Sequence, residues 1–145
     1  MARVVVHLYG RAKDESARRL IEDYQARIGN RGISVKVHSE KSLSTEDYER
    51  LLLDLGGELI LLDESGNSHS SVEFAKKVAS FGLGSNTVNL AVGPTDGFSE
   101  GIKSTGQELL SLSNMTFPHE LTAVILLEQL YRAMEINRGS PYHRG

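Results

Sequence analysis

Apolar and polar positions along the chain follow two periods, one typical of strands and one typical of helices. Apolar or alternating runs predict strands at residues 3–9, 33–37, 58–63, 87–92 and 109–113. Apolar side chains spaced three or four positions apart predict helices at 14–28, 44–55, 71–81 and near 99–105, with a polar loop at 64–70. This alternation favours an α/β fold, with a mostly parallel sheet of five or six strands and helices on both faces.

The last third of the chain predicts one long helix after the strand at 109–113. Thr116 is expected to cap this helix through its side-chain oxygen, with Pro118 in the first turn, where a missing N–H costs nothing. From Leu121 to Leu127, apolar residues surround the helix on nearly every side. A sheet covers only one side, so we expect a second packing partner, and a twin subunit in a homodimer is the simplest one.

Length and composition limit the class of protein. A chain of 145 residues with 39% hydrophobic content can bury one ordinary core, so we expect a single domain over residues 1–145. The chain has no cysteine, and His7, His38 and His69 show no ligand spacing, so no metal site is expected and these histidines receive no role. The apolar run near the N-terminus is too short for a secretory signal, and no stretch approaches the roughly 18 apolar residues of a membrane span, so we expect a cytoplasmic protein without a membrane partner.

Charge is distributed unevenly along the chain. The formal net charge of −3 argues against a protein that grips free RNA over a wide surface. Residues 1–31 nevertheless hold seven basic and four acidic side chains. This local excess allows a basic surface around the first predicted helix.

Three loops follow predicted strands, at residues 62–66, 92–97 and 113–118. In an open α/β sheet, ligands bind beyond the carboxyl ends of the strands. Loops of small residues offer backbone N–H and C=O groups to an adenosine beside an apolar slot. The three loops together therefore indicate a ligand site, although the loop at Leu62 or at Gly93 alone is better explained as an ordinary turn.

Three blocks of the sequence resemble a known family. They read LSNMTFPH at 112–119, LEQLYRA at 127–133 and PYHR at 141–144. In this order they are similar to the C-terminal signature of the large-subunit ribosomal RNA methyltransferase H family, which belongs to the SPOUT or α/β-knot class. The resemblance covers most of the chain and is dense from about Leu59 onward. It implies a C-terminal trefoil knot, in which the chain from about Gly93 to the last helix is threaded.

The resemblance also implies an activity, a cofactor and a site. The family transfers a methyl group from S-adenosylmethionine to N3 of a pseudouridine in 23S ribosomal RNA, and a homodimer acting on the assembled ribosome is the form we expect. By position, the resemblance places the cofactor at Leu62, Gly93, Ser113, Asn114, Met115, Thr116, Phe117 and Pro118. The family's glycine loop usually reads Gly-Gly-x-x-Gly, whereas residues 92–97 here read VGPTDG, and Ala123 stands where the family usually has arginine.

The C-terminal tail can supply catalytic groups. The imide N3 of pseudouridine must lose its proton, which a histidine can accept, while an arginine can bind phosphate or a developing anion. In the resembling family this tail reaches the partner subunit's cofactor site, so we expect His143 and Arg144 to act in trans, with Tyr142 stacking or hydrogen bonding. A disordered chain end is the alternative. Arg132 lies one turn after Glu128, which predicts an ion pair.

Other classes of function fit parts of the sequence. Residues 97–101 match the G-x-S-x-G pattern of serine hydrolases, with Ser99 as nucleophile. Glu108 or Glu120 could be the acid, and His143 follows in the required order. Several loop residues separate the preceding strand from Ser99, so a helix cap is its favoured role. The remaining alternatives are a non-catalytic knot dimer that binds ribosomes or a protein partner, and a SPOUT methyltransferase with another RNA substrate.

Overall fold

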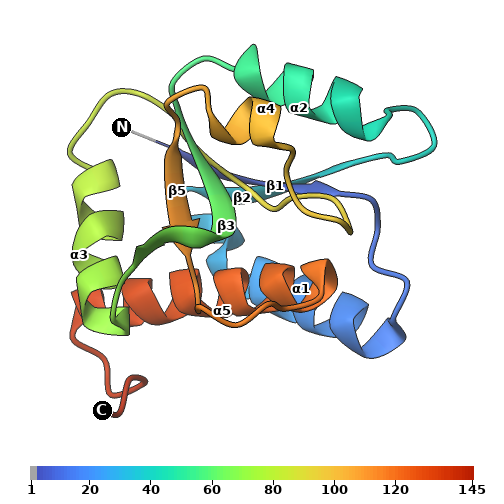
Figure 1. The fold of residues 1–145 in the computed structure, drawn as a ribbon. Helices are drawn as coiled ribbons and strands as arrows, with labels where there is room; N and C mark the ends of the chain where they lie inside the picture. The colour runs from blue at the N-terminus through green and yellow to red at the C-terminus, as the bar shows by residue number, and fades with distance from the viewer. Residues whose placement is uncertain (1–2) are drawn as a thin grey trace.

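A computed structural model describes residues 3–145, in which one sheet lies between two layers of helices (Figure 1). Its elements are β1 (Val4–Tyr9), α1 (Glu15–Ile28), the short 3₁₀ helix η1 (Gly29–Arg31), β2 (Ile33–His38), α2 (Thr45–Leu53), β3 (Glu58–Ser68), α3 (Ser71–Phe81), β4 (Val88–Ala91), α4 (Glu100–Lys103), β5 (Glu108–Ser111) and α5 (His119–Arg138). The five strands pair in the order β2-β1-β4-β3-β5, and every pair is parallel. The predicted α/β class is confirmed. The trefoil knot stays a prediction, because strand pairing does not by itself establish threading.

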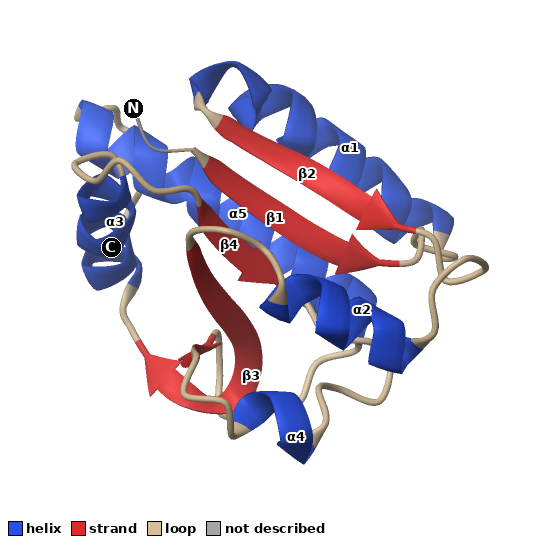
Figure 2. Ribbon diagram, turned by 90° about the horizontal axis from the view of Figure 1, so that it is seen from above, coloured by secondary structure: helices blue, strands red, loops and turns tan. Residues whose placement is uncertain are grey.

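Alternating strand residues separate two apolar cores, one on each face of the sheet. In β3, Ile60 and Leu62 belong to the core covered by α1, α3 and α5, whereas Leu59 and Leu61 belong to the core covered by α2 and α4. Figure 2 shows α2 and α4 in front of the sheet, with α1 and α5 behind it. Because residues 59–62 of β3 are buried on both faces of the sheet, they form a continuous apolar run. The prediction of helices on both faces is confirmed.

Helix α5 is covered largely within its own chain. Leu126, Leu127 and Leu130 are fully buried in the core that α1 and α3 share with α5. Neighbouring helices of the same chain therefore cover much of the apolar surface of α5, whereas Leu121 stays 46% exposed. The homodimer itself stays a prediction. The expected ion pair is confirmed, with Arg132 Nη2 2.8 Å from Glu128 Oε2.

Strand β3 is longer than its sequence predicts. It continues to Ser68, where we expected a polar loop over residues 64–70. After an interruption between Leu62 and Asn67, the strand pairs again with β5. The backbone ladder needs no apolar side chains, so exposed polar residues can pair there, and a pattern based on side chains does not detect them.

Helix α5 also begins differently from the prediction. It starts at His119, and Pro118 precedes it with no side-chain cap, so the capping role of Thr116 is wrong. The carbonyl of Pro118 instead accepts the first helical bond, from the N–H of Thr122 at 3.0 Å. Thr116 is released from the helix end and lines the cavity beneath it.

His7 of β1 and His38 of the neighbouring strand β2 contact each other on the face of the sheet that α2 and α4 cover. His7 Nδ1 lies 2.9 Å from His38 Nε2, and His7 Nε2 lies 2.8 Å from Asn89 Oδ1. The amide of Asn89 donates to the carbonyls of Gly56 and Glu58, which turns its oxygen toward His7. His7 therefore carries a proton on Nε2 and accepts at Nδ1 from His38. No ligand spacing in the sequence marks this pair, because strand pairing brings the two residues together.

We expect this histidine pair to make the fold sensitive to acid. Burial, reinforced by His7, lowers the pKa of His38 from 6.5 to about 4. Above pH 6.5 His38 is neutral in both states, but between about 6.5 and 4 the unfolded chain binds a proton that the folded chain excludes. Stability should fall over this window by an amount on the order of 3 kcal/mol.

Urea unfolding between pH 4.5 and 8 checks this expectation. The His38→Gln variant keeps a side-chain N–H donor but cannot bind the proton, so its stability should fall less steeply with acid than that of the wild type. The His69→Gln variant is the matched control, because His69 is exposed. Parallel stability curves for the wild type and the His38 variant would contradict the assignment.

Candidate functional site

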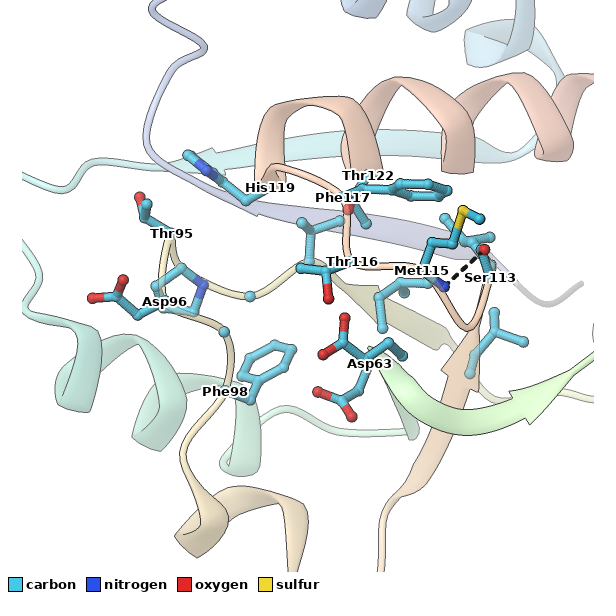
Figure 3. A pocket seen from close by; sticks show the side chains of 18 of the residues that line it. Asp63, Thr95, Asp96, Phe98, Ser113, Met115, Thr116, Phe117, His119 and Thr122 are labelled. Carbon is cyan, nitrogen blue, oxygen red and sulfur yellow. Dashed lines mark hydrogen bonds between the residues drawn. The ribbon is translucent and has the colours of Figure 1, made fainter.

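Three loops enclose a cavity of about 270 Å³ at the carboxyl edge of the sheet (Figure 3). Two of them follow β4 and β5, and the third is the interruption within β3 after Leu62; the three strands are neighbours in the sheet. The lining from these loops comprises Leu62, Asp63, Glu64, Val92, Gly93, Pro94, Thr95, Asp96, Gly97, Phe98, Leu112, Ser113, Met115, Thr116 and Phe117. This is the edge at which open α/β sheets bind ligands.

Most of the predicted cofactor residues meet at this cavity. Six of the eight line it: Leu62, Gly93, Ser113, Met115, Thr116 and Phe117. Asn114 and Pro118 lie in the same connection but outside the lining. His119 also lines the cavity from the start of α5, and so do Phe98 and Lys103, which no pattern in the sequence had placed there. The three predicted loops therefore form one site, as expected from the parallel sheet.

The connection after β5 is held by its own serines. The hydroxyl of Ser111 donates to the carbonyl of Ser113 at 2.8 Å. The N–H of Met115 donates to Ser113 Oγ at 3.0 Å, the dashed line in Figure 3. These bonds shape the loop from within, so the cavity wall is largely preformed. Met115 as a whole residue stays 74% exposed at the rim of the cavity.

The loop after β4 depends on two glycines. A Cβ on Gly93 would lie 3.1 Å from the Phe98 ring and 3.2 Å from the Phe98 nitrogen, so a side chain there would displace the cavity wall. Gly97 has a φ of 81° and donates its N–H to the carbonyl of Pro94 at 2.8 Å. The turn at residues 94–97 thus takes up the altered spacing of the glycines in this loop, and Gly93 stays at the cavity.

A charged pair lies in the cavity wall. Lys103 Nζ is 3.6 Å from Asp63 Oδ1 and 3.2 Å from Glu100 Oε1. The other oxygen of Asp63 accepts the backbone N–H of Ser65 at 3.0 Å and also the Ser65 hydroxyl. Burial opposes ionisation of Asp63, but the bonds from Ser65 and the charge of Lys103 outweigh it and lower the pKa of Asp63. This carboxylate is therefore ionised at neutral pH.

The C-terminal tail packs along α5 (Figure 1). The Tyr142 hydroxyl donates to Glu128 Oε2 at 2.9 Å, and Arg132 Nη1 donates to His143 Nδ1 at 3.0 Å, while Arg144 is exposed. Glu128 lies nine residues after His119, which is about 14 Å along the helix axis. The tail therefore folds back to the middle of α5, and none of its residues lines the cavity of its own chain.

Ser99 serves as a helix cap. Its hydroxyl accepts the N–H of Ile102 at 3.4 Å and donates to Glu49 at 2.6 Å. Strand β4 ends at Ala91, so a loop separates it from Ser99, and the ring of His143 bonds to α5 instead. The serine hydrolase alternative is wrong, because the strand, nucleophile and histidine are not brought together.

Comparison with known proteins identifies the family. A family model described as a predicted SPOUT methyltransferase matches residues 2–143. The chain belongs to the SPOUT methyltransferase family. Proteins of this family use S-adenosylmethionine as their methyl donor. The cavity fits that cofactor, because apolar Leu62, Leu110 and Leu112 offer a slot for an adenosine, and the ionised carboxylate of Asp63 suits a ligand that carries positive charge.

The chain also resembles individual proteins. Relatives named ribosomal RNA large subunit methyltransferase H include one from Anaeromyxobacter sp. (strain Fw109-5), which is 38% identical over 139 residues, or 94% of this chain and 91% of the relative. Another, from Dictyoglomus thermophilum, is 44% identical over 108 residues, or 72% of this chain and 71% of the relative. A probable methylase family protein from Haemophilus influenzae Rd KW20 shares the fold, with a TM-score of 0.56 and 11% identity, over 99% of this chain and 70% of that one.

Two further observations concern other kinds of site. Among residues 3–145, no group of three or more histidine, cysteine or acidic side chains is arranged to hold a metal ion. In the same described part of the chain, no helix combines the length and the apolar character needed to cross a membrane.

We expect Gly66 to be required for the interruption of β3 that carries Asp63 into the cavity wall. A Cβ at this position would lie 2.4 Å from the carbonyl oxygen of Leu109, so Gly66→Ala should force β3 and β5 apart and destabilise the fold by about 1–3 kcal/mol. Urea unfolding measures the loss. Gly101→Ala is the control, because its Cβ would meet Ser99 Oγ at an ordinary 3.5 Å. Equal stability of the two variants would contradict this role.

Proposed function

We propose that this SPOUT protein methylates N3 of a pseudouridine in large-subunit, 23S ribosomal RNA, using S-adenosylmethionine. The observation that carries the proposal is the meeting of three separate loops around one cavity in a chain of this family. The names of its relatives support the substrate class. The net charge of −3 favours an RNA presented by an assembled ribosome over free RNA, and hence a cytoplasmic protein.

The loops are proposed to hold the cofactor in one orientation. Leu62, Gly93 and the connection of residues 113–118 would bind the adenosine through backbone groups and apolar contacts. When bound, S-adenosylmethionine supplies a methyl group on a sulfonium, whose departure as a neutral thioether needs no metal. The protein then has to align the acceptor nitrogen, exclude water and help that nitrogen to lose its proton.

We further propose that the tail acts in the cavity of a partner subunit. Its packing along α5, outside the cavity of its own chain, supports this arrangement, because a second copy could bring its tail to that cavity. Arg132 is a donor only, so its bond to His143 Nδ1 leaves the neutral ring with its proton on Nε2. In this conformation His143 can donate to an imide carbonyl, with Arg144 stabilising the developing charge. To accept the N3 proton through Nε2, His143 must first release Arg132.

The substrate proposal is tested by methylating ribosomes from cells that lack the homologous enzyme. Labelled S-adenosylmethionine should transfer its methyl group to one pseudouridine of the large-subunit RNA, and mass spectrometry of the nucleosides should find the label on N3. Assembled ribosomes should react faster than free RNA. A label on another base, or on the small subunit, would contradict the proposed substrate.

The proposed action in trans is tested by mixing two inactive variants. Gly93→Val crowds the cavity but keeps the tail, whereas a chain truncated after Pro141 keeps the cavity but lacks the tail. In a mixed dimer one cavity meets one intact tail, so random pairing should restore about a quarter of wild-type activity. Native mass spectrometry checks that mixed dimers form. Mixed dimers without activity, or full activity of the truncated chain alone, would contradict the mechanism.

A further inference from the structure

The cavity contains one shielded carboxylate among several charged side chains. Its acidic lining residues are Asp63, Glu64 and Asp96, and its basic residue is Lys103. Glu64 and Asp96 are exposed, so water and salt screen them. The side chain of Asp63 is only 13% exposed, and Figure 3 shows it in the cavity wall below Thr116. Asp63 therefore contributes the strongest negative field inside the cavity.

The nearby lysine compensates this charge only in part. Lys103 is shared between Asp63 at 3.6 Å and Glu100 at 3.2 Å, and the contact with Glu100 is the shorter one. The Ser65 backbone and hydroxyl hold Asp63 in place without adding charge. The neighbourhood thus has two carboxylates for one ammonium group, and its net charge is negative.

The methyl donor and its product differ in charge. S-adenosylmethionine carries a sulfonium, whereas S-adenosylhomocysteine carries a neutral thioether and has the same adenosine and amino-acid groups. During transfer the bond from sulfur to the methyl carbon breaks, its electron pair stays on sulfur, and the nitrogen that gains the methyl group loses its proton. A fixed negative charge in the cavity therefore attracts the donor more strongly than the product.

We propose that Asp63 makes the cavity select the cationic methyl donor over the neutral product, and that Lys103 limits this selectivity. The inference rests on the proposed function, since it assumes that the cofactor binds in this cavity. Contacts with the adenosine and the amino-acid group are common to both ligands and cancel in the ratio of their affinities. The charge that favours binding of the donor is lost on transfer, so the same residue promotes release of the product.

Calorimetric titration of each variant with both ligands tests the proposal. The measured quantity is the Kd for S-adenosylhomocysteine divided by the Kd for S-adenosylmethionine. Asp63→Asn keeps the shape and an oxygen acceptor for Ser65, and should lower this ratio by about tenfold. Lys103→Met leaves Asp63 uncompensated, so it should raise the ratio by about threefold or more.

A matched control separates the local charge from the overall charge. Glu46→Gln also removes one negative charge, but Glu46 is exposed on α2 and lies outside the cavity lining. Its ratio should stay within about twofold of the wild type. A change in Glu46→Gln as large as that in Asp63→Asn would overturn the local role of Asp63.

The outcomes also separate this inference from the proposed function. A wild-type protein that binds neither ligand refutes the proposed function. A wild-type protein that binds both, together with an unchanged ratio in folded Asp63→Asn, refutes only the selectivity. If Asp63→Asn does not fold, the Lys103→Met variant still decides, because an unchanged or lowered ratio there contradicts the proposal.

Discussion

Parallel pairing of β3 between β4 and β5 is the constraint on which the rest of the structure depends. Because all three strands run in one direction, loops that are far apart in the sequence emerge at the same edge and enclose one cavity. The register is well specified, since a shift of one residue would exchange Ile60 and Leu61 between the two cores. The cavity is thus a consequence of how the sheet is buried.

Charges at the other end of α5 position the tail. Glu135 is 4% exposed and accepts from Arg31 at 2.7 Å, from Arg138 at 2.7 Å and from the Ser140 hydroxyl at 3.0 Å. The bonds from Arg138 and Arg31 lower the pKa of Glu135 to about 2, so it stays ionised. With the contact between Glu128 and Tyr142, these bonds order the chain end, which argues against the disordered tail considered from the sequence.

The sequence predicts the order of the elements and the loops after β4 and β5 because both depend on local patterns of side chains. It does not predict the second part of β3, whose pairing with β5 uses the backbone alone, or the meeting of His7 and His38, which depends on strand register. The burial of Leu127 between helices also depends on tertiary packing. Lys103 reaches the cavity from α4, a helix of four residues whose place relative to β3 no local pattern encodes.

The central claim is that the three loops form a binding site for S-adenosylmethionine. Calorimetric titration of this ligand into the purified protein tests it most directly, with Gly93→Val as the variant that crowds the cavity. The account predicts micromolar affinity for the wild type, about one site per chain or per dimer, and much weaker binding by the variant. No heat at millimolar ligand, checked at a second temperature, would contradict the enzyme and favour a non-catalytic knot dimer.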